Sequence, residues 1–259
     1  MQVGLSLHTE MFDAVLEHQP DIAWLEVVAE NFFSAGGHHD KLLRLREDYD
    51  LSLHCLNMNI GGTDALDDMY LQNVAALCAK FQPTLLSGHI SYETHAGECL
   101  HDLLPIPFNT ESLRNSVARV GRIQETLQRR LLLENISYYT EYEESDIAEV
   151  EFNNALAKDS GAGLLLDLNN LWVNHVNLRY SVADYLAALH WDSVGEVHLA
   201  GGEEQDNLLI DTHGAAVPAQ VLALLRTSQD KLPATAPIIY ERDTNIPSLP
   251  DLLRFREQL

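Results

Sequence analysis

The stretch that decides the fold is GLLLD at residues 163–167, where three leucines lead directly into an aspartate. A short apolar run without in-out alternation is typical of a strand that is buried on both faces of a parallel sheet. Five further runs have the same form and also end on His or Glu: LSLH (51–54), TLLSGH (84–89), RLLLE (130–134), VGEVH (194–198) and PIIYE (237–241). Because parallel strands of a closed sheet end at the same mouth, all six polar side chains are expected there.

Two more apolar runs, VGLSL at 3–7 and AWLEVV at 23–28, bring the expected strands to eight. Segments with helical periodicity separate several of them, and a final one follows the last strand: 65–81, 110–129, 144–160, 182–190, 215–228 and 248–259. Strands that alternate with helices indicate a parallel sheet, and eight of them at this length favour a (β/α)8 TIM barrel. No low-complexity linker divides the chain, so residues 1–259 are expected to form a single domain with a metal site at the C-terminal mouth of the barrel.

Local signals refine the segmentation. Thr110 and Ser112 suit a helix N-cap region, Pro218 suits the first turn of its helix, and Gly161 suits a helix end. Four stretches after strands are expected to be irregular and to cover the mouth: 57–64, 91–109, 169–180 and 201–214.

Charge and cysteine content narrow the partners and the compartment. Lys and Arg total 16 against 39 Asp and Glu, a formal charge of -23, which disfavours nucleic-acid phosphates and anionic membrane lipid. The three cysteines, Cys55, Cys78 and Cys99, have no CxxC spacing and indicate a reducing compartment. No apolar run reaches the roughly 20 residues that span a bilayer, and no cleavage signal is recognisable. A cytoplasmic protein is expected.

The strand ends carry donors suited to zinc, iron or manganese, because histidine nitrogen and carboxylate oxygen bind these metals. One polar strand end is often only a capping residue, but a cation is the usual compensation when several carboxylates and imidazoles are buried together. Asp211 and His213 are two residues apart and can point to one side of an extended segment, while Asn170 lies three residues beyond Asp167. The six strand-end residues are candidates for both metal binding and catalysis: His54, His89, Glu134, Asp167, His198 and Glu241. Three further candidate metal ligands are Asn170, Asp211 and His213.

In their order along the chain, from His54 to Glu241, these nine residues resemble the trinuclear centre of the xylose-isomerase-like barrels, which include endonuclease IV. The resemblance implies a first metal on His54, His89 and Glu134. It implies a second metal on Glu134, Asp167, His198 and Glu241, with Glu134 bridging, and a third on Asn170, Asp211 and His213. The nuclease pattern has histidine where this chain has Asn170, and the harder, weaker amide ligand points to a different or more labile third metal.

Local sequence motifs make the resemblance more specific. The strings LSLHCLNMNIGG (51–62), LLLENISYY (131–139), GLLLDLNNLWVN (163–174) and IIYERDTNIPSL (238–249) resemble the multinuclear non-haem iron family that includes MbnB of methanobactin biosynthesis, TglH and ChrH. The resemblance implies two or three iron ions, dioxygen as co-substrate, and oxidative modification of cysteine in a ribosomally made precursor peptide. It also implies a small partner protein that binds the leader segment of the peptide.

Three other functions fit the same ligand types. The first is a zinc hydrolase or phosphodiesterase of the endonuclease IV type, in which metal-bound hydroxide attacks phosphorus. The acidic composition disfavours DNA as its substrate but leaves a small phosphorylated one. The second is a sugar isomerase, for which no strand-end lysine is present. The third is a non-catalytic metal-binding module with a closed ligand set.

Residues beside the ligands have smaller expected roles. Glu26 and Glu30 flank the end of the second strand and suit partners that orient ligands. His101 and Asp102 are expected in a loop over the mouth, and His8 at its polar rim. His38, His39, His95 and His175 are expected in surface loops. Cys78 is expected in the core, and Cys55 should point away from its neighbour His54.

Overall fold

Eight parallel strands close into a barrel, in the order β1-β12-β9-β8-β7-β4-β3-β2. The computed structural model describes residues 2–34 and 36–259, so Met1 and Ala35 of the expected 1–259 domain lie outside the described residues. The barrel strands are β1 (Val3–Ser6), β2 (Trp24–Val28), β3 (Asp50–Cys55), β4 (Leu85–His89), β7 (Leu132–Glu134), β8 (Gly163–Asp167), β9 (Val194–Leu199) and β12 (Ile238–Tyr240). The predicted eight-stranded TIM barrel is confirmed.

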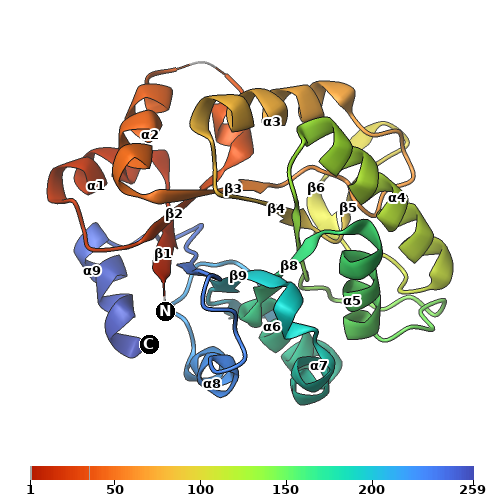
Figure 1. Cartoon of the computed structure of the whole chain (residues 1–259). Helices are drawn as coiled ribbons and strands as arrows, with labels where there is room; N and C mark the ends of the chain where they lie inside the picture. Colours follow the sequence, from red (N-terminus) through yellow and green to blue (C-terminus); the bar gives the residue numbers. More distant parts are fainter. Residues whose placement is uncertain (1, 35) are drawn as a thin grey trace.

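Helices surround the barrel on its outside, with the two chain ends near each other beside α9 (Figure 1). They are α1 (Phe12–His18), α2 (Gly37–Asp48), α3 (Asp68–Phe81), α4 (Thr110–Leu127), α5 (Glu149–Ser160), α6 (Leu168–Leu178), α7 (Val182–Ala188), α8 (Ala219–Ser228) and α9 (Leu249–Leu253). Short 3-10 turns are η1 (Thr9–Met11), η2 (Ala29–Phe32), η3 (Trp191–Ser193) and η4 (Arg254–Gln258). Over the described residues, none of the helices combines the length and apolar character required to cross a membrane.

Strand register sets which polar ends are neighbours. His89 at the end of β4 pairs with Glu134 at the end of β7, and Asp167 at the end of β8 pairs with His198 of β9. His54 of β3 pairs with Ser87 of β4. The six strand-end residues therefore surround one opening at the carboxyl end of the barrel, where parallel strands of such a fold end together.

The opposite, amino end of the barrel has a cavity that apolar side chains such as Trp24 and Leu132 line together with polar ones such as Asp50 and Arg129. Leu132 fills the interior there, and a Cβ atom placed on Gly163 or Gly195 would lie only 2.6 or 2.7 Å from its side chain. Glycine at these two positions lets the neighbouring strands approach the leucine. The candidate metal ligands lie at the other, carboxyl end.

The mouth is less irregular than the sequence indicated. Residues 169–180 were expected to be a loop, but α6 begins directly after β8, and the Asp167 carboxylate caps it by accepting from the Asn170 amide at 2.6 Å. Leu168 and Leu171 anchor this helix in the core. The polar asparagines concealed the helical spacing of these apolar residues, which is why the stretch was misread.

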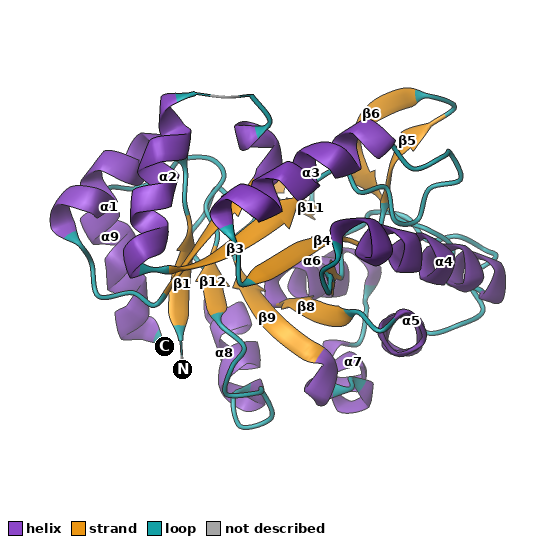
Figure 2. Cartoon of the chain, turned by 45° about the horizontal axis from the view of Figure 1, so that its top comes forward, coloured by secondary structure: helices purple, strands orange, loops and turns teal. Residues whose placement is uncertain are grey.

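Two hairpins occupy the other stretches that were expected to be irregular. Within 91–109 lie β5 (Tyr92–His95) and β6 (Glu98–Leu104), and within 201–214 lie β10 (Glu203–Gln205) and β11 (Leu208–Ile210). Figure 2 shows the β5–β6 hairpin beyond the tip of β4, beside α3 and α4. Both hairpins follow barrel strands and belong to the mouth.

Helix ends differ by a few residues from those expected. Asn109, not Thr110 or Ser112, caps α4, because its side chain accepts from the amides of residues 111 and 112. Pro218 is the N-cap residue of α8 and not part of its first turn, and α5 begins at Glu149 instead of residue 144. Gly161, with φ of 74°, ends α5 as expected.

Candidate metal centre

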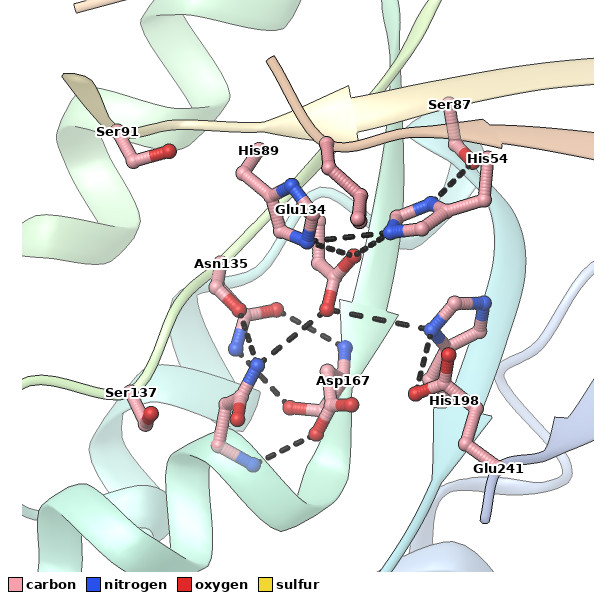
Figure 3. Close-up of polar contacts among 12 residues, drawn as sticks. His54, Ser87, His89, Ser91, Glu134, Asn135, Ser137, Asp167, His198 and Glu241 are labelled. Carbon is pink, nitrogen blue, oxygen red and sulfur yellow. Dashed lines mark hydrogen bonds and ion pairs between the residues drawn. The ribbon is translucent and has the colours of Figure 1, made fainter. Parts of the chain in front are cut away.

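Three strand ends converge first. His54 Nε2 lies 3.1 Å from His89 Nε2, and Glu134 Oε2 lies 3.6 Å from the first nitrogen and 3.4 Å from the second. Figure 3 shows the two imidazoles on either side of the Glu134 carboxylate. The other ring nitrogen of His54, Nδ1, contacts Ser87 Oγ at 2.7 Å, which orients Nε2 toward the group. Two imidazole nitrogens and a carboxylate oxygen that face one another could hold a cation.

A second group shares Glu134 with the first. Asp167 and His198 offer ligand atoms within 4.8 Å of each other and of Glu134, so these three form another possible metal-binding set. His198 Nδ1 lies 3.0 Å from Glu241 Oε2 and 3.9 Å from Glu134 Oε1. Glu134 therefore faces the first group with Oε2 and the second with Oε1, as a bridging carboxylate would.

The loop residues are held differently. Asp211 lies 2.9 Å from His213 Nε2, and its carboxylate also accepts from Ser137 Oγ at 3.0 Å and Asn169 Nδ2 at 2.6 Å. His213 joins Asp167 and Glu241 in a further possible metal-binding set. Asp211 and His213 thus contact each other, and His213 also lies close to Asp167 and Glu241 of the second group.

Asn170 lies inside the centre. Its Nδ2 donates to Glu134 Oε1 at 3.3 Å and to the Asn135 carbonyl at 3.0 Å. Its Oδ1 is buried and finds no hydrogen-bond partner among the described residues. The nitrogen therefore orients the bridging carboxylate, while the amide oxygen is left buried and unpaired beside it.

Burial and like charge shift the pKa values of the centre. Burial, together with the nearby carboxylates of Asp167 and Glu241, raises the pKa of Glu134 well above its usual value. Burial and the carboxylate of Asp211 raise the pKa of Asp167 to about 7. Burial and the neighbouring imidazole of His54 lower the pKa of His89 far below its usual value. Each of these shifts reflects the free-energy cost of burying like charges next to one another without a cation.

Unpaired oxygen atoms test whether the residues fit a metal. Four buried oxygens of the candidate ligands find no hydrogen-bond donor among residues 2–34 and 36–259: Glu134 Oε2, Asp167 Oδ2, Asn170 Oδ1 and Glu241 Oε2. An unsatisfied buried polar atom costs roughly 1–3 kcal/mol, and more when it is charged. Their convergence, with imidazole nitrogens between them, fits divalent cations bound by nitrogen and oxygen donors.

Sequence reasoning missed four polar residues around the centre. Glu196 is fully buried two residues before His198 and on the same side of β9. Asp243 Oδ2 lies 3.0 Å from His213 Nδ1, and Asn135 and Asn169 bond to Asp167 and Asp211. Because side chains two residues apart on a strand point to the same side, the position of Glu196 before His198 could have indicated its place in the centre. No sequence pattern indicates a loop contact such as that of Asp243.

The remaining expectations have mixed outcomes. Glu26 contacts His198, and Glu30 accepts from the amides of Leu56 and Asn57 just beyond β3. His8 Nε2 contacts the Arg242 carbonyl at 2.7 Å. Cys55 and Cys78 are both buried, as expected for Cys78.

Several histidines lie outside loops. His39 was expected at the surface but is buried in α2, where it bonds to the Phe32 carbonyl. His38 and His175 are exposed on α2 and α6, and His95 is exposed on β5. His101 and Asp102 belong to strand β6 and not to a loop.

Comparisons with known proteins agree with the fold and with the sequence motifs of the chain. The family described as RiPP precursor modification enzyme MbnB/TglH/ChrH matches residues 2–259. A UPF0276 protein of Anaeromyxobacter sp. is 36% identical over 252 residues, covering 97% of this chain and 89% of that protein. A UPF0276 protein of Rhizobium meliloti is 40% identical over 237 residues, covering 89% of this chain and 76% of that protein.

Solved structures with the same fold have little sequence in common with the chain. Endonuclease IV of Thermus thermophilus aligns with a TM-score of 0.66 at 16% identity, over 100% of this chain and 97% of that one. A D-psicose 3-epimerase aligns with a TM-score of 0.58 at 14% identity, over 96% and 87%. At such identities the likeness concerns the barrel alone.

Proposed function

Because the chain belongs to the MbnB/TglH/ChrH family of RiPP precursor modification enzymes, we propose that it oxidatively modifies cysteine in a ribosomally made precursor peptide, using iron and dioxygen. The observation that carries the proposal is the convergence of His54, His89, Glu134, Asp167 and His198, buried at the barrel mouth with unpaired carboxylate oxygens. A small partner protein that holds the leader segment completes the proposed system.

Two ions have strand-held ligands in this proposal. His54, His89 and Glu134 hold the first, and Glu134, Asp167, His198 and Glu241 hold the second. Glu134 is suited to bridge them because its two oxygens face the two groups separately. A third ion takes Asn170, Asp211 and His213, once the contacts of Asp211 with His213 and Asn169 are exchanged for the cation.

Iron held by such donors supplies one-electron chemistry with dioxygen and affinity for a thiolate sulfur. The chain's own residues supply orientation. Ser87 fixes the ring of His54, and Asn170 Nδ2 fixes the carboxylate of Glu134. The hairpins beside the mouth limit the approach of water, so that the peptide cysteine meets the centre in one orientation.

The surface charge supports a peptide over a polyanion. With a formal charge of -23 the protein repels phosphate backbones, whereas a peptide chain approaches without that penalty. The charge disfavours DNA as the substrate of the zinc phosphodiesterase alternative, although a small phosphorylated substrate remains compatible with it. The likeness to endonuclease IV, at 16% identity, concerns the barrel and not the reaction.

One paired assay tests the proposal. Protein loaded with Fe²⁺ or with Zn²⁺ is incubated in air with the cysteine-bearing peptide encoded beside its gene, with and without a small partner protein encoded there. We expect a change in peptide mass that maps to cysteine, only with iron and only in the presence of oxygen. Unchanged peptide in all iron samples, together with phosphodiester cleavage by the zinc form, would contradict the proposal and favour the hydrolase.

A further inference from the structure

A layer of polar side chains lies inside the barrel directly beneath the candidate ligands. Ser52 of β3 and Glu196 of β9 each precede a ligand, His54 or His198, by two residues and so point to the same side of their strands. Glu26 of β2 pairs in register with Ser52. All three are buried to at least 99%, at a level where TIM barrels normally place apolar side chains.

His198 connects this layer to the centre. Its Nε2 lies 3.3 Å from Glu26 Oε2, whereas its Nδ1 lies 3.0 Å from Glu241 Oε2 on the other side of the ring. A neutral imidazole carries hydrogen on only one nitrogen and offers a lone pair on the other. If Nε2 donates to Glu26, the lone pair of Nδ1 faces the metal-binding group.

The Glu26 carboxyl is itself held in place. Ser52, its register partner on β3, donates through Oγ to Glu196 Oε2 at 3.1 Å, and Glu196 in turn offers a carboxylate oxygen within 4.8 Å of one on Glu26, so Ser52 and Glu196 pack beside the Glu26 carboxyl. Nothing in this trio reaches the open mouth, because Glu26 and Glu196 are enclosed by the strands. Substrate contact therefore does not explain it, whereas support of His198 does.

We propose that Glu26 is a positioning residue of the centre. It accepts the Nε2 hydrogen of His198, fixes the tautomer that presents Nδ1 to the second cation, and is kept in place by Ser52 and Glu196. The inference rests on the metal-binding part of the proposed function only. It needs neither iron as the metal nor a peptide as the substrate.

A competing interpretation uses the same atoms. Glu26, Glu196 and His198 lie close enough to hold a cation themselves, and Oε1 of each glutamate has no hydrogen-bond partner among the described residues. Such an ion would compete with the Nε2–H of His198 for the same lone pair. The contact between His198 Nε2 and Glu26 favours the positioning role, and the two interpretations differ in the number of bound ions.

Titration with Co²⁺ distinguishes them, since its visible absorption reports ligand geometry. Removing an outer partner of a histidine ligand typically weakens metal binding roughly 10–100-fold. We expect that loss in E26A for the cation on His198, with an altered Co²⁺ spectrum. E26Q, whose amide oxygen accepts the same hydrogen, should restore most of the affinity. E149Q, which alters a buried carboxyl of α5 remote from His198 in the sequence, serves as the matched control and should bind as the wild type does.

A second measurement needs no variant. In the Zn²⁺-loaded wild type, ¹⁵N chemical shifts of the histidine rings should show His198 protonated on Nε2 and metal-bound through Nδ1. Circular dichroism and the melting temperature of E26A establish whether that variant folds. If it does not, the ring shifts and E26Q still decide the matter.

Four results would overturn the inference. The first is metal bound through Nε2 of His198, and the second is unchanged Co²⁺ affinity and spectrum in folded E26A. The third is a Co²⁺ affinity of E26Q as low as that of E26A. The fourth is the loss of one whole ion in E196Q while the other sites stay occupied. A wild type that binds no cation would refute the metal centre of the proposed function, and the positioning role with it. A wild type that binds cations normally but leaves the peptide unchanged would refute only the proposed reaction.

Discussion

Two regions of this protein bury a carboxylate among polar side chains, and they differ in what meets it. At the start of α5, Glu149 is 7% exposed, and its Oε2 accepts from Tyr138 Oη at 3.0 Å. At the barrel mouth, Glu134 is 2% exposed, and its Oε2 has no hydrogen-bond donor among the described residues. Burial of an acid is therefore common to both regions. The unpaired oxygen, which faces imidazoles, distinguishes the mouth as the candidate cation site.

The largest expected effect is the loss of Glu134. E134A removes the shared ligand of both strand-held groups, so it should lose both ions and reduce peptide modification beyond the roughly 10–100-fold caused by loss of an outer partner. Metal-free E134A should melt no lower than the metal-free wild type, because the variant no longer buries an unpaired carboxyl. Metal analysis and calorimetry check this. Full metal content in E134A would show that the mouth does not hold the ions through Glu134.

Metal removal should have the next largest effect. A ligand at about a hundred times its dissociation constant stabilises the folded state by about 2.7 kcal/mol, and each kcal/mol shifts the melting temperature of a protein of about this size by about 2–4 °C. Chelation should thus lower the melting temperature of the wild type by several degrees. E149Q should show the same decrease and E134A almost none. An equal decrease in all three proteins would show that the stabilising ion binds elsewhere than at the barrel mouth.

A smaller effect is expected from the loop ligands. Asp211 and His213 are 14% exposed in their side chains and contact each other, unlike the fully buried His198. D211N should lower the metal content by no more than one ion and preserve most of the stabilisation by metal. Metal analysis after gel filtration measures this. A D211N protein without any bound metal would show that the loop, and not the strands, holds the centre together.

The smallest effect concerns pH. Burial, opposed in part by hydrogen bonds from Tyr180 and Tyr138, raises the pKa of Glu149 from 4.5 to about 7. Because the folded state holds this proton more tightly, its stabilisation is complete below the pKa of the unfolded chain and is lost as the pH rises toward 7. Metal-free E149Q should therefore lose less stability than the wild type between pH 5 and 7.5, by at most about 1.4 kcal/mol per pH unit. Urea unfolding at both pH values measures the difference, and identical slopes would contradict it.

The sequence predicted the barrel because eight apolar runs, each short and continuous, leave few other solutions. It also predicted that the six strand-end residues share one mouth, because parallel strands of a closed sheet end together. The pairing of His89 with Glu134 and of Asp167 with His198 is set by strand register, which the structure supplies. What it could not predict depends on side-chain direction. That Asn170 would turn its nitrogen to Glu134, and that Glu26 would meet His198 from a strand distant in sequence, follows only from packing inside the closed barrel.

Helix α6 was misread for a related reason. The asparagines at 169, 170 and 174 suggested a loop, but each is buried with hydrogen-bond partners, and Leu168 and Leu171 beside them are buried in the core. Propensity rules count asparagine as a turn former because its side chain competes for backbone hydrogen bonds. Here tertiary partners satisfy those side chains, so the penalty does not apply.

Anomalous diffraction from crystals of the iron-loaded protein, collected on both sides of the iron absorption edge, tests the central claim most directly. Two or three peaks are expected at the barrel mouth, one between His54, His89 and Glu134 and one between Glu134, Asp167, His198 and Glu241. No peak should occur beside Glu149. An empty mouth in crystals that contain iron elsewhere, or iron bound without contact to Glu134, would contradict the claim.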